Sequence, residues 1–192
     1  VECYAKRFTG SDSYQLTPWD FSYYSNKLKE YKFNVNSELL RPYFELSRVL
    51  NAVFNLSTRL YGISFVRNRD LPVYHEDVEA YEVYDEDGTF LALLYCDFYS
   101  RPSKKPGAWM TMFKEQWTDD EMCDSRPHVS IVMNFAKPTS EIPSLLSLEE
   151  VETLLHEFGH SLHAMFSKVK YRSLSCTNVL WDFVELPSQI ME

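Results

Sequence analysis

Five consecutive residues, His156-Glu157-Phe158-Gly159-His160, carry the clearest chemical signal in the sequence. Two histidines four positions apart on an α-helix are separated by about 40° of rotation and about 6 Å of rise, so their imidazoles can converge on one cation. Zn²⁺ accepts ligands at this spacing, and the glutamate between them stands beside the ion without binding it. The pattern predicts a site for one zinc ion, with His156 and His160 as ligands and Glu157 as general base. The alternative is a pair of ordinary helix histidines.

A carboxylate downstream is the candidate third ligand. Glu185 lies 25 residues after His160, in a stretch that we interpret as the start of another helix. The positive end of a helix dipole keeps a carboxylate ionised, which suits an oxygen ligand for zinc. The other common arrangement has a third histidine ten residues after the first, but that position is Phe166. The alternative for Glu185 is a capping role, with Asp182 as the N-cap.

His163 lies seven residues after His156 and therefore on nearly the same face of the helix. Its Cα is about 10 Å farther along the axis, which is long for a shared ion. We interpret His163 and Asp182 as residues that support the ligands or pack near them. Zinc held in this way would activate water and polarise a substrate carbonyl, with Glu157 moving the proton to the leaving amine. The predicted chemistry is hydrolysis of a peptide bond.

The helix that carries the two histidines has a start signal. Ser147 and Glu150 form a capping box, in which each side chain satisfies a free backbone amide of the other. The apolar residues that follow at helical spacing are Leu148, Val151, Leu155, Leu162 and Val169. These residues predict an amphipathic helix with one buried face.

Two further helices are predicted near the start of the chain. Thr17-Pro18 indicates a helix start, because proline is favoured at the first helical position, and the helix runs to Tyr31. A second apolar pattern runs from about Tyr43 to Tyr61, and Gly62 is placed to end it.

The middle of the chain is rich in aromatic and β-branched residues and predicts strands. The strands expected are 63–66, 81–84, 90–98, a possible edge strand at 107–113 and a buried strand at 129–135. Asp87-Gly88 is a hairpin signal between two of them. We therefore expect a small antiparallel sheet beside the zinc helix.

These elements define three consecutive segments: helical residues 1–62, β-rich residues 63–136 and zinc-binding helices in residues 147–192. We interpret residues 1–192 as a partial catalytic domain of α+β class. Because the chain begins with Val1 rather than methionine and ends in a helical pattern, we expect the N- and C-terminal parts of a longer protein to be missing.

Composition excludes several classes of protein. The net charge of −9 argues against a nucleic-acid partner, and no apolar run approaches the length of a membrane span. The four cysteines lie far apart without a C-x-x-C pair, so reduced thiols and a cytoplasmic location are expected, with a periplasmic location as the alternative. The expected partners are short peptides, with no nucleic acid and no membrane, and we expect a monomer.

The residues are similar to the thimet oligopeptidase family of zinc metallopeptidases, and especially to its bacterial peptidyl-dipeptidase branch. The similarity is carried by His156-Glu157-Phe158-Gly159-His160-Ser161-Leu162-His163, Thr177-Asn178, Asp182-Phe183-Val184-Glu185-Leu186-Pro187-Ser188-Gln189, Pro18-Trp19-Asp20, Arg41-Pro42-Tyr43-Phe44, Leu71-Pro72-Val73-Tyr74-His75 and Gly107-Ala108-Trp109. It spans nearly the whole chain.

The resemblance implies zinc ligation by His156, His160 and Glu185, with Glu157 as base, in a mainly helical, zincin-like protein with a deep channel. It also implies that the strand at Gly107-Ala108-Trp109 borders the cleft and binds substrate by β-addition, against the alternative of an ordinary edge strand. The function implied is release of C-terminal dipeptides from short peptides. An oligo-endopeptidase of the same family and a non-catalytic zinc-binding interaction domain remain as alternatives.

Some positions depart from the family pattern. Cys96 and Cys176 stand where glycine is expected, and Pro106 replaces a glycine before Gly107. A positive-φ backbone at Cys176 would be strained. The family's transition-state histidine and tyrosine lie beyond Glu192, so we expect this chain alone to hydrolyse peptides poorly or not at all.

Overall fold

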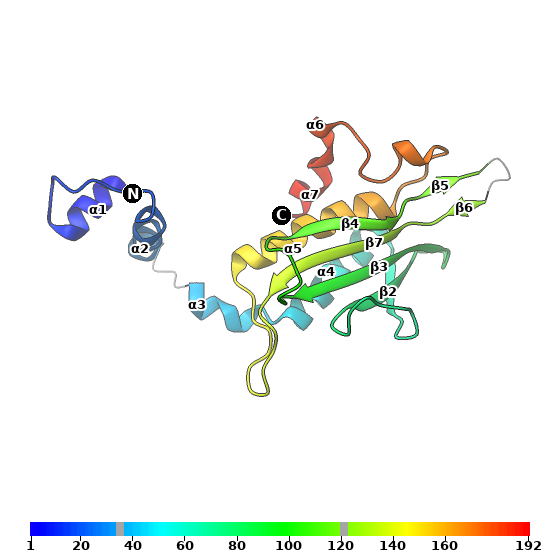
Figure 1. Cartoon of the computed structure of the whole chain (residues 1–192), viewed down its shortest axis with the longest axis horizontal. Coiled ribbons are helices and arrows are strands. Elements are labelled where there is room, and N and C mark those ends of the chain that lie inside the picture. Colours follow the sequence, from blue (N-terminus) through cyan, green and yellow to red (C-terminus); the bar gives the residue numbers. More distant parts are fainter. Residues whose placement is uncertain (34–36, 120–122) are drawn as a thin grey trace. The chain divides into compact units, whose positions relative to one another are not determined.

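The computed structural model describes residues 1–33, 37–119 and 123–192 (Figure 1). The chain divides into two compact units, Val1–Arg41 and Pro42–Glu192. The boundary lies before the second predicted helix, which therefore belongs with the sheet rather than with the first helices. None of the described helices is both long and apolar enough to cross a membrane.

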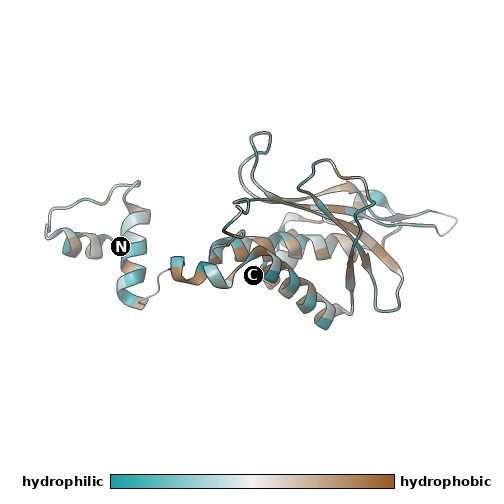
Figure 2. Cartoon of the chain, turned by 90° about the horizontal axis from the view of Figure 1, so that it is seen from below, coloured by the Kyte–Doolittle hydropathy of each residue, from teal (hydrophilic) through white to brown (hydrophobic). Residues whose placement is uncertain are grey.

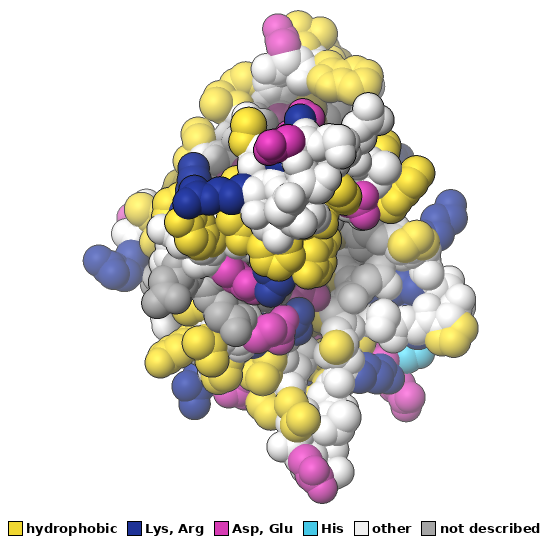
Figure 3. Space-filling model, turned by 90° about the vertical axis from the view of Figure 1, so that its left-hand side faces the viewer, with side chains coloured by type: hydrophobic (Ala, Val, Ile, Leu, Met, Phe, Trp, Pro, Cys, Tyr) yellow, Lys and Arg dark blue, Asp and Glu magenta, His cyan; other side chains and the backbone are white. Residues whose placement is uncertain are grey.

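The described residues of the first unit form three α-helices, α1 (Glu2–Thr9), α2 (Phe21–Phe33) and α3 (Ser37–Leu40). Helix α2 begins three residues later than Pro18 predicts, because the residues before it form a turn. In that turn the hydroxyls of Tyr14 and Thr17 donate to the Asp20 carboxylate at 2.8 and 2.5 Å. Hydrophobic side chains are scattered between charged ones over the face drawn in Figure 3.

The second unit contains a sheet with helices before and after it. Its elements are η1 (Arg41–Tyr43, which spans the unit boundary), α4 (Leu46–Tyr61), β1 (Ser64–Arg67), β2 (Glu79–Tyr84), β3 (Phe90–Tyr99), β4 (Trp109–Lys114), β5 (Trp117–Thr118), β6 (Asp124–Ser125), β7 (His128–Phe135), α5 (Leu148–Met165), η2 (Arg172–Leu174), α6 (Trp181–Val184) and α7 (Leu186–Met191). Helix α4 is capped by Gly62, whose φ of 76° suits glycine and confirms the predicted stop.

The main sheet has the strand order β1-β2-β3-β7-β4 and is mixed, so the prediction of an antiparallel sheet was wrong in one respect. Strand β7 pairs parallel to β3, while every other pair in this sheet is antiparallel. Strand β7 follows β4 in the chain but is inserted between β3 and β4. The expected hairpin joins β2 and β3, and β4 lies at the edge of the sheet as predicted.

The two faces of the sheet have different coverings. Alternate side chains of β3 and β7, including Leu94, Phe98 and Ile131, pack with α4 and α5 in the main core. A smaller cluster that includes Val78, Leu93 and Tyr95 covers the opposite face. Figure 2 shows the hydrophobic colour concentrated along the sheet and the helices beside it.

Helix α5 begins with the predicted capping box, since Ser147 Oγ accepts from the Glu150 amide and the Glu150 carboxylate accepts from the Ser147 amide. The buried face differs from the predicted stripe, because Leu148 is exposed and Val169 lies beyond the end of the helix. The buried apolar side chains of α5 are Leu154, Phe158, Leu162, Ala164 and Met165.

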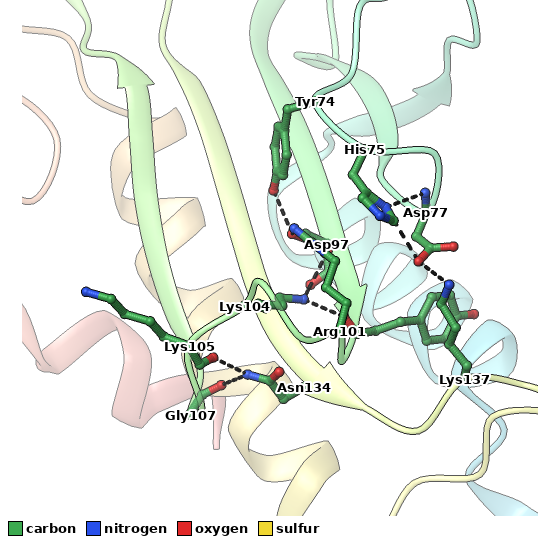
Figure 4. Close-up of polar contacts among 11 residues, drawn as sticks. Tyr74, His75, Asp77, Asp97, Arg101, Lys104, Lys105, Gly107, Asn134 and Lys137 are labelled. Carbon is green, nitrogen blue, oxygen red and sulfur yellow. Dashed lines mark hydrogen bonds and ion pairs between the residues drawn. The ribbon is translucent and has the colours of Figure 1, made fainter.

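A polar cluster is buried on the sheet face opposite α5 (Figure 4). Asp97 of β3, which is 1% exposed, accepts two bonds from Arg101 at 2.7 and 2.8 Å, one from Lys104 at 3.0 Å and one from Tyr74 at 2.9 Å. Burial acts to raise the pKa of Asp97, but the bonds from Arg101, Lys104 and Tyr74 outweigh it and lower that pKa. Asp97 is therefore held ionised inside the fold.

Asp97→Asn is expected to reduce the free energy of unfolding at pH 7 by about 3–5 kcal/mol, because it leaves the buried Lys104 and Arg101 without their counter-charge. The folded-state pKa is lowered, so this contribution is present above the ordinary aspartate pKa of about 3.9 and is lost as the pH falls through the folded value. Urea unfolding between neutral and acid pH measures the effect. Asp70→Asn makes the same change at an exposed position, and an equal loss in both variants at pH 7 would contradict the assignment.

Candidate metal centre

Two histidines four residues apart and a glutamate 25 residues farther along the chain converge on one point. Nε2 of His156 and Nε2 of His160 lie 3.3 and 3.2 Å from the same Glu185 oxygen, Oε2. The ligand atoms of this group all lie within 4.8 Å of one another, and within the described ranges no other such His, Cys, Asp or Glu group is found. Neighbouring ligands of a tetrahedral zinc are about 3.3 Å apart when the bonds are about 2.0–2.1 Å long. The two nitrogens and one oxygen therefore fit the donor set of a zinc site.

The site is sheltered but not closed. The side chains of His156, His160 and Glu185 are 25%, 12% and 45% exposed. A catalytic zinc site leaves a coordination position open for water, whereas a structural site has four protein ligands. The three side chains and their exposure fit the open type.

A residue that the sequence reasoning missed supports the first histidine. Oε1 of Glu192 lies 2.5 Å from Nδ1 of His156. A proton shared in this contact leaves the Nε2 lone pair of His156 free to face a metal, and such carboxylate–histidine pairs are common behind zinc ligands. The signal was the seven-residue spacing of Glu185 and Glu192, which places both on one face of a helix.

Glu185, the third candidate ligand, is the N-cap of helix α7, which agrees with the expectation that it lies near the start of a helix. The hydroxyl of Ser188, which is fully buried, lies 2.8 Å from both the carboxylate Oε2 and the carbonyl oxygen of Glu185. This contact orients the carboxylate before any ion binds. Asp182 is not the N-cap: Leu180 caps α6, and Asp182 is exposed in the first turn of that helix.

Gly159 lets α7 approach the histidines. A Cβ atom at Gly159 would lie 2.6 Å from both the Pro187 carbonyl oxygen and the Ser188 Cα, closer than any normal contact. The two helices therefore meet backbone to backbone at this point. Because Glu185 and Glu192 flank the contact, the packing at Gly159 sets the position of both carboxylates relative to His156.

Glu157 lies on the buried side of α5, next to β4. Burial raises the pKa of its carboxyl group, and the nearby Glu185 carboxylate acts in the same direction. His156 and the backbone amide of Met110 in β4 lower that pKa and oppose part of the shift. A raised pKa makes the Glu157 carboxylate a better proton acceptor than an ordinary glutamate, as a general base requires.

His163 lies one turn beyond His160 and faces Phe183, with ring centroids 5.9 Å apart. Its Nδ1 is buried and has no hydrogen-bond partner among the described residues. Burial lowers the pKa of His163, and the neighbouring His160 adds to that effect. His163 therefore packs beside the site as a neutral imidazole and is not one of the three converging side chains.

Two buried polar residues hold the chain where it leaves α5. Arg126 donates to the carbonyl oxygens of Met165 and Ser167 at 2.6 and 3.1 Å. Gln116, which is fully buried, accepts from the Val169 amide at 2.8 Å and donates to its carbonyl at 3.2 Å. These bonds fix the connection that leads from the two histidines to Glu185.

The sequence that carries this site is similar to known proteins. Residues 2–192 match peptidase family M3. The chain belongs to this family. It is 46% identical over 180 residues to dipeptidyl carboxypeptidase of Escherichia coli K12, a match that covers 93% of this chain and 26% of the relative. It is 38% identical over 193 residues to oligopeptidase A of the same organism, covering 100% of this chain and 28% of the relative.

A plant relative shows a similar match: a probable cytosolic oligopeptidase A of Arabidopsis thaliana is 40% identical over 198 residues, covering 100% of this chain and 28% of the relative. The M3 chain described here spans about a quarter of the length of the curated relatives that it matches.

Cys176, one of the positions where glycine is expected in this M3 chain, has an unusual backbone conformation. Cys176 has a φ of 58° and is the only residue other than glycine with a positive φ in the described part of the chain. The expectation of strain at this position is confirmed, because L residues rarely adopt this conformation. The amide of Cys176 donates to Ser167 Oγ at 3.0 Å, and its side chain is buried in the main core. Packing holds the strained residue in place.

Gly159→Ala is expected to weaken both the fold and metal binding in this M3 chain. The same change in an exposed helix interior stabilises by up to about 1 kcal/mol, but here α7 must move away, at a cost of about 1–3 kcal/mol. Thermal unfolding and zinc titration against a chromogenic chelator measure the two effects. Thr153→Ala, at an exposed position of α5, is the matched helix variant. A more stable Gly159→Ala protein with normal zinc affinity would contradict the packing argument.

Glu192→Gln is expected to lower zinc affinity by about 10–100-fold, because the amide no longer polarises and orients His156 as a carboxylate does. The fold should be retained, since Glu192 is exposed at the end of α7. Competition with a chelator of known affinity measures the change. Glu152→Gln, an exposed acid on α5, serves as the control. If both variants bind zinc equally well, Glu192 has no part in the site.

Proposed function

We propose that this M3 chain supplies the zinc ligands and the general base of a peptidase that releases dipeptides from the C-termini of short peptides. The observation that carries the proposal is the convergence of His156, His160 and Glu185, with Glu157 on the same helix as the histidines. The substrate class takes its support from the relatives, because the Escherichia coli protein at 46% identity is named dipeptidyl carboxypeptidase.

The residues have distinct roles in the proposed reaction. Zn²⁺ held by His156, His160 and Glu185 would supply Lewis acidity, which activates water and polarises the peptide carbonyl. Glu157 takes a proton from the attacking water and passes it to the leaving amine. Glu192 keeps His156 in the tautomer that presents Nε2. The two histidines contact Glu185, and Glu192 contacts His156. Glu157 is the residue that follows His156 in the chain.

The edge strand offers a place for the substrate backbone. Strand β4 pairs with β7 on one side, and no described strand pairs with its other side. An extended peptide can add to such an edge through main-chain hydrogen bonds. We propose that Gly107-Ala108-Trp109, where β4 begins, binds substrate in this way. Its position fits this role because β4 lies against α5, the helix that carries Glu157.

Two other activities compete with this proposal. An oligo-endopeptidase is supported by the 38–40% identity to proteins named oligopeptidase A. A non-catalytic zinc-binding domain would need a fourth protein ligand to close the site, and the additional carboxylate, Glu192, contacts Nδ1 of His156 rather than completing the group. Peptides with free and amidated C-termini separate the first two activities, since only an endopeptidase should cleave both equally.

The four cysteines are unpaired in the structure, and we propose a cytoplasmic location and a monomeric state for the protein. We further expect the 192-residue chain by itself to bind zinc but to hydrolyse peptides poorly or not at all, because it spans only 26% of the relative whose name supports the activity.

The decisive experiment compares two variants of the complete protein. Glu157→Gln should keep its zinc, and its rate of peptide hydrolysis should fall by about 10²–10⁴-fold, because the proton acceptor is gone while the ligands remain. Glu185→Ala should lose both the metal and the activity. Zinc content by atomic emission and dipeptide release by chromatography provide the measurements.

The exposed carboxylate Glu141, changed to glutamine, is the control for general effects of charge. Full turnover by Glu157→Gln, or full zinc content in Glu185→Ala, would rule out the assigned roles.

A further inference from the structure

The loop that joins β3 to β4, residues 100–108, makes an unusual connection. The two strands it joins are not neighbours, because β7 lies between them. The loop therefore passes over the end of β7 before the chain re-enters the sheet as its edge strand. A surface loop of this length is normally mobile unless side chains hold it, so its anchors decide where β4 begins.

The first half of the loop is held by Asp97 at the end of β3 (Figure 4). Arg101 donates two bonds to this carboxylate, and Lys104 bonds the same carboxylate and the carbonyl oxygens of Asp97 and Tyr99, both at 2.8 Å. The Lys104 side chain is only 2% exposed. A fully buried lysine from a loop fixes that loop firmly, because moving it would leave the charges of Lys104 and Asp97 unpaired.

The second half of the loop is held by β7. The side-chain amide of Asn134 donates to the carbonyl oxygens of Lys105 and Gly107 at 2.8 and 2.7 Å, as Figure 4 shows. Gly107 has a φ of 96°, which a residue with a side chain would not readily adopt. The loop is thus tied to each of the two adjacent strands, and it delivers the chain to Trp109 in a defined position.

The anchors act on the strand beside the candidate metal centre. Tyr74, which donates to Asp97, also packs its ring 5.8 Å from that of Phe113 in β4. On the other face of the sheet, Met110 of β4 packs against the main core, and β4 lies against α5, the helix that carries Glu157. At the far end, Gln116 binds Val169. The edge strand is held at both ends although it has only one neighbouring strand.

We infer that Asp97, Arg101 and Lys104 are positioning residues for the edge strand: they lock the 100–108 loop so that β4 keeps its place beside Glu157 and presents its free edge to a peptide. These residues lie on the sheet face away from α5 and touch none of the candidate zinc ligands. The effect on catalysis rests on the proposed peptidase function, whereas the effect on β4 is a property of the fold.

The variant Arg101→Gln tests the inference in the complete protein. The arginine side chain is 16% exposed, and Lys104 still neutralises Asp97 in its absence, so the fold should be retained. Hydrogen exchange followed by mass spectrometry should show faster exchange in residues 105–114 and not in β2. For peptide hydrolysis, KM should rise about tenfold with kcat within about threefold of wild type, because binding along the edge is lost equally from substrate and transition state.

Two matched variants sharpen the test. Arg67→Gln breaks an arginine–carboxylate pair with Glu79 on the opposite edge of the same sheet, and should leave β4 exchange, KM and kcat unchanged. Arg101→Lys keeps the charge without the two-pronged bond, and should give a smaller rise in KM than Arg101→Gln. Zinc content should equal that of wild type in all three variants, which a general loss of structure around α5 would not allow.

The possible outcomes separate the two hypotheses. Faster exchange in 105–114 together with a higher KM at full zinc content supports the inference. Unchanged exchange, unchanged KM, or the same effects in Arg67→Gln would overturn it while leaving the peptidase proposal standing. A wild-type protein that hydrolyses no peptide would refute the proposed function, and the role of these residues in catalysis would be refuted with it.

Discussion

Helix α7 can reach the two histidines only because Gly159 has no side chain. The backbone of Pro187 and Ser188 occupies the space that a Cβ would fill, so two helices meet at a distance that no other residue permits. A helix of six residues is unstable by itself in water, and its position here comes from packing. This one contact sets the position of Glu185 at the start of α7 and of Glu192 just after its end.

The contact also concentrates negative charge. Glu157 lies on the same helix as His156 and His160, and the Glu185 and Glu192 carboxylates contact these histidines, so three carboxyl groups share one small region. Carboxylates brought together in a partly dry site repel one another, and a divalent cation between them offsets that repulsion. Without an ion, this cluster of carboxylates destabilises the folded state. With a divalent cation bound, the same carboxylates favour binding.

Local patterns in the sequence predicted the parts of this site that depend on neighbours in the chain. The capping box at Ser147, the spacing of the two histidines and the hairpin at Asp87-Gly88 are all local features, and the structure has each of them. The parallel pairing of β7 with β3, which depends on tertiary contacts, was not predicted. The insertion of β7 beside β3 leaves no periodic signature, because a buried strand reads the same in parallel and antiparallel pairs.

The same limit applies to side chains that act at a distance. Glu192 reads as an ordinary terminal acid until α7 is seen to bring it to His156. Asp97 reads as one charge in an apolar strand until Arg101 and Lys104 are seen to fold back onto it. Leu148 follows the helical spacing and yet is exposed, because the first turn of α5 extends beyond the core. Such outcomes depend on where the elements lie relative to one another.

The position of β7 in the sequence, well after its neighbour β3, affects how the protein folds during synthesis. Strand β3 is ten residues long and almost wholly buried, yet the partner for one of its two edges is synthesised about thirty residues later. Until that partner emerges from the ribosome, a long apolar strand shows an open edge, the feature that drives strands of separate chains to associate. Growing chains from which β7 has not yet emerged therefore carry an exposed strand edge that favours aggregation.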